Sequence, residues 1–232
     1  MNRNILFFLL FTLFSLNGVC QNKEKTASSP TFKMSGSALL TSHHISHGLS
    51  QTQSDPALQV QFAYNLGPQI EFGLWGSNVR FPQSDEHLNL HFFGKAMVQF
   101  TANTQLDLDY RLSRYFHNDR RNGSILQLQF NMFEYYVLLS SNSNWEGSSS
   151  SSSHFGFGHK YNFSTLFNLE TQFSYNQLSA TGYNNFFDIL VEANYISNDT
   201  IKYAAGLTLN SESSQFRGAG DPFLYARIKT TF

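Results

Sequence analysis

His44 and Ser46 have the residue types and the spacing that nucleophilic catalysis requires. On a strand, residues two apart share a face, so the imidazole could take the serine proton. Such a pair also needs a third group that orients the histidine, and Asp55 and Gln59 are the nearest options. The pair therefore points to hydrolysis only if one of these two side chains reaches it.

Three histidines, at positions 43, 44 and 47, also raise the question of a metal site. Histidines four residues apart suit zinc on a helix, but nothing in this segment indicates a helix. On a strand, His43 and His47 would share a face about 13 Å apart. A polar loop at the rim of a larger structure is the simpler interpretation, and no metal or cofactor is expected.

Alternating apolar and polar residues recur along the chain, which is the pattern of strands with one apolar face. From Phe167 to Tyr175 one face is largely apolar, while the face from Asn168 to Asn176 is wholly polar. This pattern predicts an all-β fold, a transmembrane antiparallel up-and-down barrel with an even number of strands. The twelve predicted strands cover residues 32–43, 57–66, 69–78, 87–100, 105–116, 124–130, 134–143, 154–163, 167–178, 187–196, 201–210 and 222–232.

The predicted connections alternate between long and short. Short ones cover residues 67–68, 101–104, 131–133, 164–166 and 197–200. Long ones cover residues 44–56, 79–86, 117–123, 144–153, 180–186 and 211–221. Membrane barrels have short periplasmic turns and longer extracellular loops, so this sorting favours a barrel over a soluble sandwich.

The N-terminus has the features of a cleaved signal peptide, residues 1–20. Arg3 precedes an apolar run from Ile5 to Leu16, which is too short to span a bilayer as a helix. Cleavage after Gly18 or Cys20 suits the preference for small residues, and Cys20 leaves lipidation open. Residues 21–31 are expected to form a periplasmic lead, followed by a single barrel domain over residues 32–232.

Charge and hydropathy exclude other classes. The formal net charge is −1, so no basic field exists for nucleic acid. No later apolar run approaches the length of a transmembrane helix, so a membrane protein of this sequence must be a barrel. Cys20 is the only cysteine, so the mature chain is expected to lack disulfide chemistry.

The chain ends on Phe232, which closes a strand with two different faces. Even-numbered residues from Leu224 onward are mostly apolar, whereas the odd-numbered ones include Arg227 and Lys229. This ending resembles that of bacterial outer-membrane barrels. The resemblance implies that Phe232 is an assembly signal, read by the barrel-assembly machinery, and that the chain is exported to the outer membrane and surrounded by its lipid.

Three segments near the start of the mature chain resemble the TorF-type porin family. Ser42–Thr52 is similar to the family's S-D-Y-x-F-R-G-x-S-Q-T, Asp55–Gln59 to its D-P-A-hydrophobic-Q, and Gly73–Val79 to its G-hydrophobic-W-G-S-N-V. Positions 43, 44, 46 and 47 depart from it, with His, His, Ser and His where Asp, Tyr, Phe and Arg are usual. The resemblance implies an outer-membrane porin and leaves the solute open.

The H-x-S pair also resembles that of two outer-membrane lipid hydrolases, phospholipase A and lipid A deacylase. Those enzymes carry an orienting acid or amide about twelve residues beyond the serine, where this chain has Leu58. The porin-family resemblance accounts for the same segment without chemistry. We therefore expect a protein that is not an enzyme and keep a lipid hydrolase using His44 and Ser46 as an alternative.

The expected function is passive diffusion of small hydrophilic solutes through a narrow lumen. A strongly selective pore needs a ring of one charge sign, whereas the inward positions mix acids and bases. A structural or adhesive barrel with a plugged lumen is the other alternative. The predicted lumen-lining residues are Glu71, Trp75, Lys95, Asp107, Asp109, Arg111, Glu134, Glu170, Glu192, Lys202, Arg227 and Lys229.

Overall fold

The computed structural model describes residues 32–81 and 84–232. The predicted signal peptide, residues 1–20, and the predicted lead, residues 21–31, lie outside the described residues. Among the residues that are described, no helix has the length and apolar character needed to cross a membrane.

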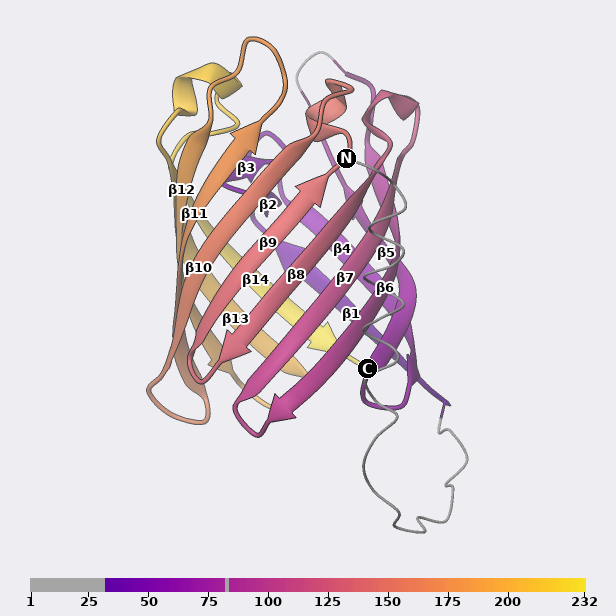
Figure 1. Ribbon diagram of the computed structural model, residues 1–232, viewed down its shortest axis with the longest axis vertical. Coiled ribbons are helices and arrows are strands. Elements are labelled where there is room, and N and C mark those ends of the chain that lie inside the picture. Colours follow the sequence, from indigo (N-terminus) through magenta and orange to yellow (C-terminus); the bar gives the residue numbers. More distant parts are fainter. Residues whose placement is uncertain (1–31, 82–83) are drawn as a thin grey trace. The chain divides into compact units, whose positions relative to one another are not determined.

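The barrel domain is a closed antiparallel ring of twelve strands, which confirms the predicted fold (Figure 1). The strands follow one another round the ring in chain order, and the first and last strands pair to close it. They are β1 (Phe32–Thr41), β4 (Ala57–Leu66), β5 (Ile70–Asn78), β6 (Leu88–Thr101), β7 (Thr104–Tyr115), β8 (Gly123–Met132), β9 (Tyr135–Asn142), β10 (Ser152–Asn162), β11 (Phe167–Leu178), β12 (Phe186–Ile196), β13 (Ile201–Asn210) and β14 (Phe223–Thr231).

The register at the closure is regular. Strand β1 pairs Ser37 with Thr231 and Thr41 with Arg227 of β14, and on its other side it pairs Thr41 with Ala57 of β4. Because every strand has a neighbour on both sides, the ladder leaves no open edge, and the backbone polar groups are satisfied within the wall.

The two faces of the wall differ as the alternation predicts. On β11, Phe173 has 51% of its surface exposed, whereas the adjacent Ser174 has none. On β10, Phe155 and Phe157 are exposed while the intervening Gly156 is buried. Large exposed apolar side chains surround the barrel, and a continuous apolar surface of this kind suits contact with lipid rather than water.

The connections separate by length between the two ends of the barrel. Five short turns lie at the lower end in Figure 1, and six longer loops lie at the upper end. Three loops at the upper end carry short 3-10 helices: η2 (Asp119–Arg121), η3 (Trp145–Gly147) and η4 (Ser213–Phe216). We call these ends the short-turn end and the long-loop end.

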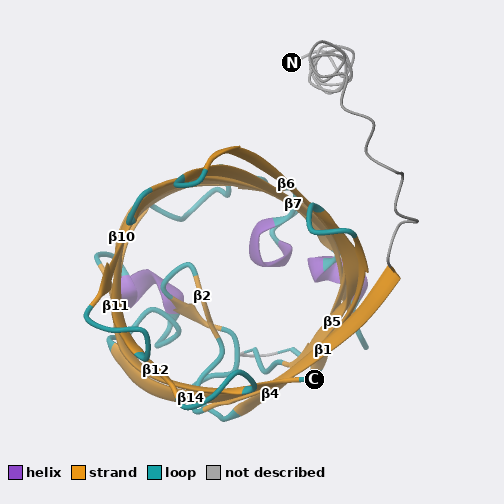
Figure 2. Ribbon diagram, turned by 90° about the horizontal axis from the view of Figure 1, so that it is seen from below, coloured by secondary structure: helices purple, strands orange, loops and turns teal. Residues whose placement is uncertain are grey.

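The loop between β1 and β4, residues 42–56, contains a feature that the strand pattern did not predict. It forms a small hairpin of its own, β2 (Ile45–Ser46) and β3 (Leu49–Ser50), which is not part of the ring. Viewed along the barrel, β2 lies inside the ring rather than outside it (Figure 2). We call residues 42–56 the in-folded loop.

Candidate functional site in the barrel lumen

The in-folded loop is fixed at the long-loop end by contacts with several other loops. Leu49, only 4% exposed, belongs to an apolar cluster with Trp145, Ala180, Phe186 and Phe216. The backbone N–H of Ser50 donates to the carbonyl of Ala219 at 2.7 Å, and that of Arg80 donates to the carbonyl of Gln51 at 2.9 Å. Loops far apart in sequence therefore hold the hairpin in place.

His44 and Ser46 project from this loop but interact with different partners. His44 Nδ1 lies 3.3 Å from the hydroxyl of Ser77, and Ser46 Oγ lies 3.5 Å from His47 Nδ1. Within the described residues no hydrogen bond joins His44 to Ser46. Asp55 instead pairs with Arg80 at 2.5 Å, so it does not orient the imidazole of His44.

The three histidines of the loop point to different neighbours. His43 packs against Phe223, His44 against the edge of Trp75, and His47 against His154, with ring centroids 5.3, 5.6 and 4.3 Å apart. No group of three or more metal-ligating acid, cysteine or histidine side chains gathers in the described part of the chain. Each of the three loop imidazoles therefore contacts a different aromatic side chain.

Burial makes these imidazoles poor bases. The surrounding wall keeps the rings of His44 and His47 from bulk water, and the ring of His43 is partly buried, which disfavours the charged form. Burial lowers the pKa of His44 to about 4 and that of His43 below its usual value. The pKa of His47 falls to about 3, chiefly through burial, with further effects from His154 and Arg111. At neutral pH the loop therefore carries no charge on its histidines.

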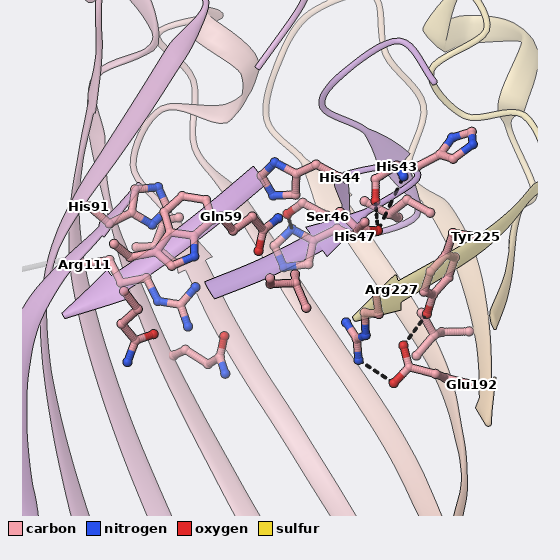
Figure 3. Close-up of a pocket in the computed structure, with 18 of the residues that line it drawn as sticks. His43, His44, Ser46, His47, Gln59, His91, Arg111, Glu192, Tyr225 and Arg227 are labelled. Atoms are coloured by element: carbon pink, nitrogen blue, oxygen red, sulfur yellow. Dashed lines mark hydrogen bonds and ion pairs between the residues drawn. The ribbon is translucent and has the colours of Figure 1, made fainter. Parts of the chain in front are cut away.

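Directly beside the loop lies a cavity of about 390 Å³, which we call the loop cavity (Figure 3). Trp75 lines it, packed between His44 and His91, whose ring centroid is 4.6 Å from that of the indole. The tryptophan predicted to face inward therefore narrows the lumen beside the loop. Gln59, Arg111 and Arg227 also line this cavity.

Two more cavities lie in the lumen. The lysine cavity, about 300 Å³, contains Lys202 and Lys229 in its wall, and it shares Gln59, Trp75 and Arg227 with the loop cavity. The acidic cavity, about 290 Å³, is lined by residues that include Asp107 and Asp109. It shares Lys95 and Gln127 with the loop cavity. The three cavities are therefore adjacent.

Three of the lumenal bases are paired with acids. Lys95 Nζ lies 3.2 Å from Glu71 Oε1, and Arg111 Nη2 lies 2.6 Å from Asp109 Oδ2. The third pair joins Arg227 to Glu192.

Glu192 is only 2% exposed, and it also accepts a hydrogen bond of 2.7 Å from the hydroxyl of Tyr225. A buried carboxylate needs such a cation, because an unpaired charge in that position is strongly destabilising.

The other lumenal acids make neutral hydrogen bonds. Asp107 accepts from the amide of Asn131 at 2.7 Å, and Glu170 accepts from the hydroxyl of Tyr136 at 2.9 Å. Lys202 and Lys229 lie directly opposite each other in the register of β13 and β14. The described residues include no ion pair to either lysine.

Glu134 is placed differently from the prediction. It lies in the short turn between β8 and β9, one residue before β9 begins, and its carboxylate is 3.7 Å from Nε2 of His159. His159 packs against the outward ring of Tyr135 at 4.6 Å between centroids. Glu134 therefore belongs to the outer rim of the short-turn end and does not line any of the three cavities.

The terminal Phe232 lies against the first strand. Its backbone exchanges two hydrogen bonds with Gly36, at 2.8 and 2.9 Å, and its ring packs edge-on against Phe62. Gly36 has no side chain to displace that ring; an added Cβ would lie 2.3 Å from it. The last residue thus completes the seam between β14 and β1 while its ring stays exposed to the outside.

Two tyrosines that serve the lumenal acids were not anticipated. Tyr136 and Tyr225 each lie over a glycine of the neighbouring strand, Gly158 and Gly206, where an added Cβ would come within 2.0 and 2.5 Å of the ring. Glycine within a strand often marks such a close approach. An inward glycine beside an inward tyrosine in the sequence could therefore have indicated these two tyrosines.

Comparisons with solved structures agree with this architecture. A KdgM porin matches with a TM-score of 0.56 at 8% identity over 85% of this chain and 98% of that one. A KdgM porin in complex with disordered oligogalacturonate gives 0.54 at 9% identity over 87% and 98%. An outer membrane channel from Pseudomonas putida F1 gives 0.51 at 14% identity over 92% and 100%. At these identities the likeness establishes the fold, which is that of outer-membrane porins and channels.

Sequence comparisons supply a family. A search of curated proteins finds no match. A family profile described as "Bacterial protein of unknown function (Gcw_chp)" matches residues 24–214, which is most of the chain and includes eleven of the twelve barrel strands. This family does not carry the TorF name that the opening segments suggest. The chain belongs to the Gcw_chp family, and its barrel has the fold of outer-membrane porins.

Proposed function

We propose that this protein is a porin of the bacterial outer membrane through which small hydrophilic solutes diffuse passively. The observation that carries the proposal is the set of three adjacent lumenal cavities inside a closed barrel with an apolar exterior. Their walls offer amides, hydroxyls and charged groups, which replace part of the water around a polar solute. No cofactor or chemical step is required.

The class of barrel gives the orientation. The short-turn end would face the periplasm and the long-loop end the outside, with membrane lipid around the apolar belt. Twelve strands lie between small barrels that side chains fill and large porins with wide channels. Solutes of sugar size would therefore pass one at a time beside the in-folded loop.

Related structures support a hydrophilic solute. One of the similar structures is a KdgM porin in complex with disordered oligogalacturonate, so a barrel of this fold can hold a saccharide. We retain the TorF-type resemblance of residues 42–79 as part of the proposal, together with export by a cleaved signal peptide and insertion by the barrel-assembly machinery.

The in-folded loop favours one second candidate, a structural barrel with a plugged lumen. Leu49 and its apolar cluster hold the hairpin within the ring, and a hairpin that never moved could block passage. Ion conductance distinguishes the porin from the plugged barrel, because only a porin conducts ions when it is folded.

The test is conductance of the purified full chain in a planar bilayer, combined with the swelling of liposomes in neutral sugars. The heat-dependent mobility of a folded barrel on a denaturing gel serves as the folding control. We expect discrete conductance steps and swelling that becomes slower as the sugar becomes larger. A folded barrel that inserts but conducts no ions would replace the porin with the structural candidate.

A further inference from the structure

The lysine cavity differs in charge from the rest of the lumen. Lys202 and Lys229 are cross-strand partners near the short-turn ends of β13 and β14, and both line this cavity. Like charges directly opposite each other on antiparallel strands are destabilising, so the pair costs the barrel stability.

Neither lysine has an ion-pair partner in the described structure, and Glu71, which pairs with Lys95, exerts only an electrostatic attraction on Lys229. The wall of the lysine cavity contains no aspartate or glutamate, and its third base, Arg227, is already paired with the buried Glu192. Lys95 and Arg111, the other paired bases, do not line this cavity. Its wall therefore carries two positive charges that have no ion-pair partner among the described residues.

Neutral donors and acceptors complete the wall. Gln59, Gln61 and Asn194 contribute carboxamides, and Trp75 contributes an indole. Carboxamides and an indole suit the hydroxyls and the apolar face of a polyhydroxylated ring, while ammonium groups form their strongest hydrogen bonds with ionised oxygens.

Two of the lumenal acids lie on the opposite side of the ring from the lysines. Asp107 and Asp109 belong to β7, which is six strands away from β13 in either direction round the barrel. Asp109 is paired with Arg111, so Asp107 is the β7 acid that repels an anionic group, whereas Lys202 and Lys229 attract it to the β13–β14 wall.

We propose that the lysine cavity binds the anionic group, a carboxylate or a phosphate, of a hydroxyl-bearing solute. The inference rests on the proposed function, because it names the substrate class for the same lumen. Lys202 and Lys229 contact the anionic oxygens from two strands, and the carboxamides contact the neighbouring hydroxyls. The cavity is then an anion-binding site on the permeation path, between the in-folded loop and the short-turn end.

Binding is measured first, because it does not require a conducting pore. Purified full chain in detergent is titrated with glucose 6-phosphate, glucuronate and glucose. Binding is measured by tryptophan fluorescence and by isothermal titration calorimetry. We expect saturable binding of one or both anions and none of glucose. The two anion arms distinguish phosphate from carboxylate. Replacing both lysines, Lys202→Gln with Lys229→Gln, should weaken binding by on the order of tenfold per lysine.

A matched control removes the same charge elsewhere. Lys33→Gln with Lys160→Gln also deletes two lysines, and neither residue lines any of the three cavities. That variant should bind like the unaltered chain. Equal binding in both double variants, or equal binding of glucose and the anions, would overturn the inference.

Conductance measurements then test the anion site and the porin function independently of each other. In a low-salt gradient the reversal potential of the unaltered chain should show anion preference, and the Lys202→Gln/Lys229→Gln variant should lose it. Conductance without anion binding would refute the lysine site and leave the porin standing. Anion binding to a folded barrel that never conducts would keep the lysine site and refute the porin.

Discussion

The imidazole of His47 on the in-folded loop packs against that of His154 on β10, with 4.3 Å between ring centroids. Arg111 contributes to the low pKa of His47, so protonating that ring would place a cation near a guanidinium and beside a second histidine. Protonation of His47 therefore disfavours this contact.

The first prediction is that acid loosens the in-folded loop. With pKa values of about 4 and 3, His44 and His47 are neutral in the docked loop, whereas the histidines of a released loop have the usual pKa of about 6.5. Docking is fully stable above pH 6.5 and loses stability as the pH falls toward about 4 for His44 and about 3 for His47, by up to about 1.4 kcal/mol per pH unit for each histidine. Conductance and protease cleavage of the loop, followed from neutral to acid pH, should both rise.

A variant with His44→Asn and His47→Asn provides the control for this pH effect. It lacks the rings of His44 and His47 and keeps that of His43, and asparagine tolerates the left-handed backbone of position 47, where φ is 49°. Its loop should respond less to acid than that of the unaltered chain. An identical response in the two proteins would show that other groups govern the loop.

Leu49→Ala should free the in-folded loop without acid. The substitution removes a buried leucine from the cluster with Trp145 and Phe216, where such losses cost about 2–5 kcal/mol. Single-channel records should show higher or more variable conductance at neutral pH. Leu40→Ala is the matched control, because Leu40 is 54% exposed on the outer face and should leave conductance unchanged. Indistinguishable records from the two variants would argue against a movable loop.

Arg227→Gln should destabilise the barrel more than Lys229→Gln does. Arg227 is the ion-pair partner of Glu192, a carboxylate with only 2% of its surface exposed. Without Arg227 the buried carboxylate of Glu192 lacks its cation, which costs up to about 3 kcal/mol because the arginine itself is partly exposed, while losing Lys229 relieves a repulsion. The measurement is the midpoint of heat- or denaturant-induced unfolding in detergent. Equal midpoints for the two variants would mean that Glu192 does not depend on Arg227.

Deleting Phe232 should lower the yield of barrel in the outer membrane more than it alters the pore. The deletion removes both backbone hydrogen bonds to Gly36 and the terminal aromatic ring. Phe62→Ala removes only the ring that packs against it and serves as the control. Membrane fractions from cells that produce each variant give the yield. A normal yield without Phe232 would show that assembly does not require the last residue.

Ser46→Ala should leave every activity of the protein unchanged. Its hydroxyl lies beside His47, and His44 is engaged with Ser77, so the predicted H-x-S pair is not joined. Purified barrel in detergent is assayed against phospholipid and lipid A. Ester hydrolysis that is present in the unaltered chain and absent in the variant would establish the lipid-hydrolase alternative.

The strands were predictable because lipid and lumen enforce a strict two-residue period on every one of them. The ends of the strands were less predictable. Residue 134 was expected to begin a strand, but that strand starts at Tyr135, so Glu134 lies in a turn rather than in the lumen. Periodicity identifies a face, but the first residue of a strand depends on local turn geometry.

The in-folded loop and the pairing of charges could not be read from the sequence. The hairpin from Ile45 to Ser50 is stabilised by contacts such as Leu49 with Phe216, whose partners come from the far end of the chain. The alternation predicted that Lys202 and Lys229 face inward, but only the register of β13 and β14 sets them opposite each other.

The lumen differs at its two ends, with a neutral histidine-bearing hairpin at one and, at the other, two lysines that have no ion-pair partner among the described residues. An anion arriving from the short-turn end is concentrated by the lysines before it reaches the narrow step beside Trp75. An anion arriving from the long-loop end meets that step first. The barrel should therefore rectify: at equal salt on both sides, reversing the sign of the voltage should change the size of the current.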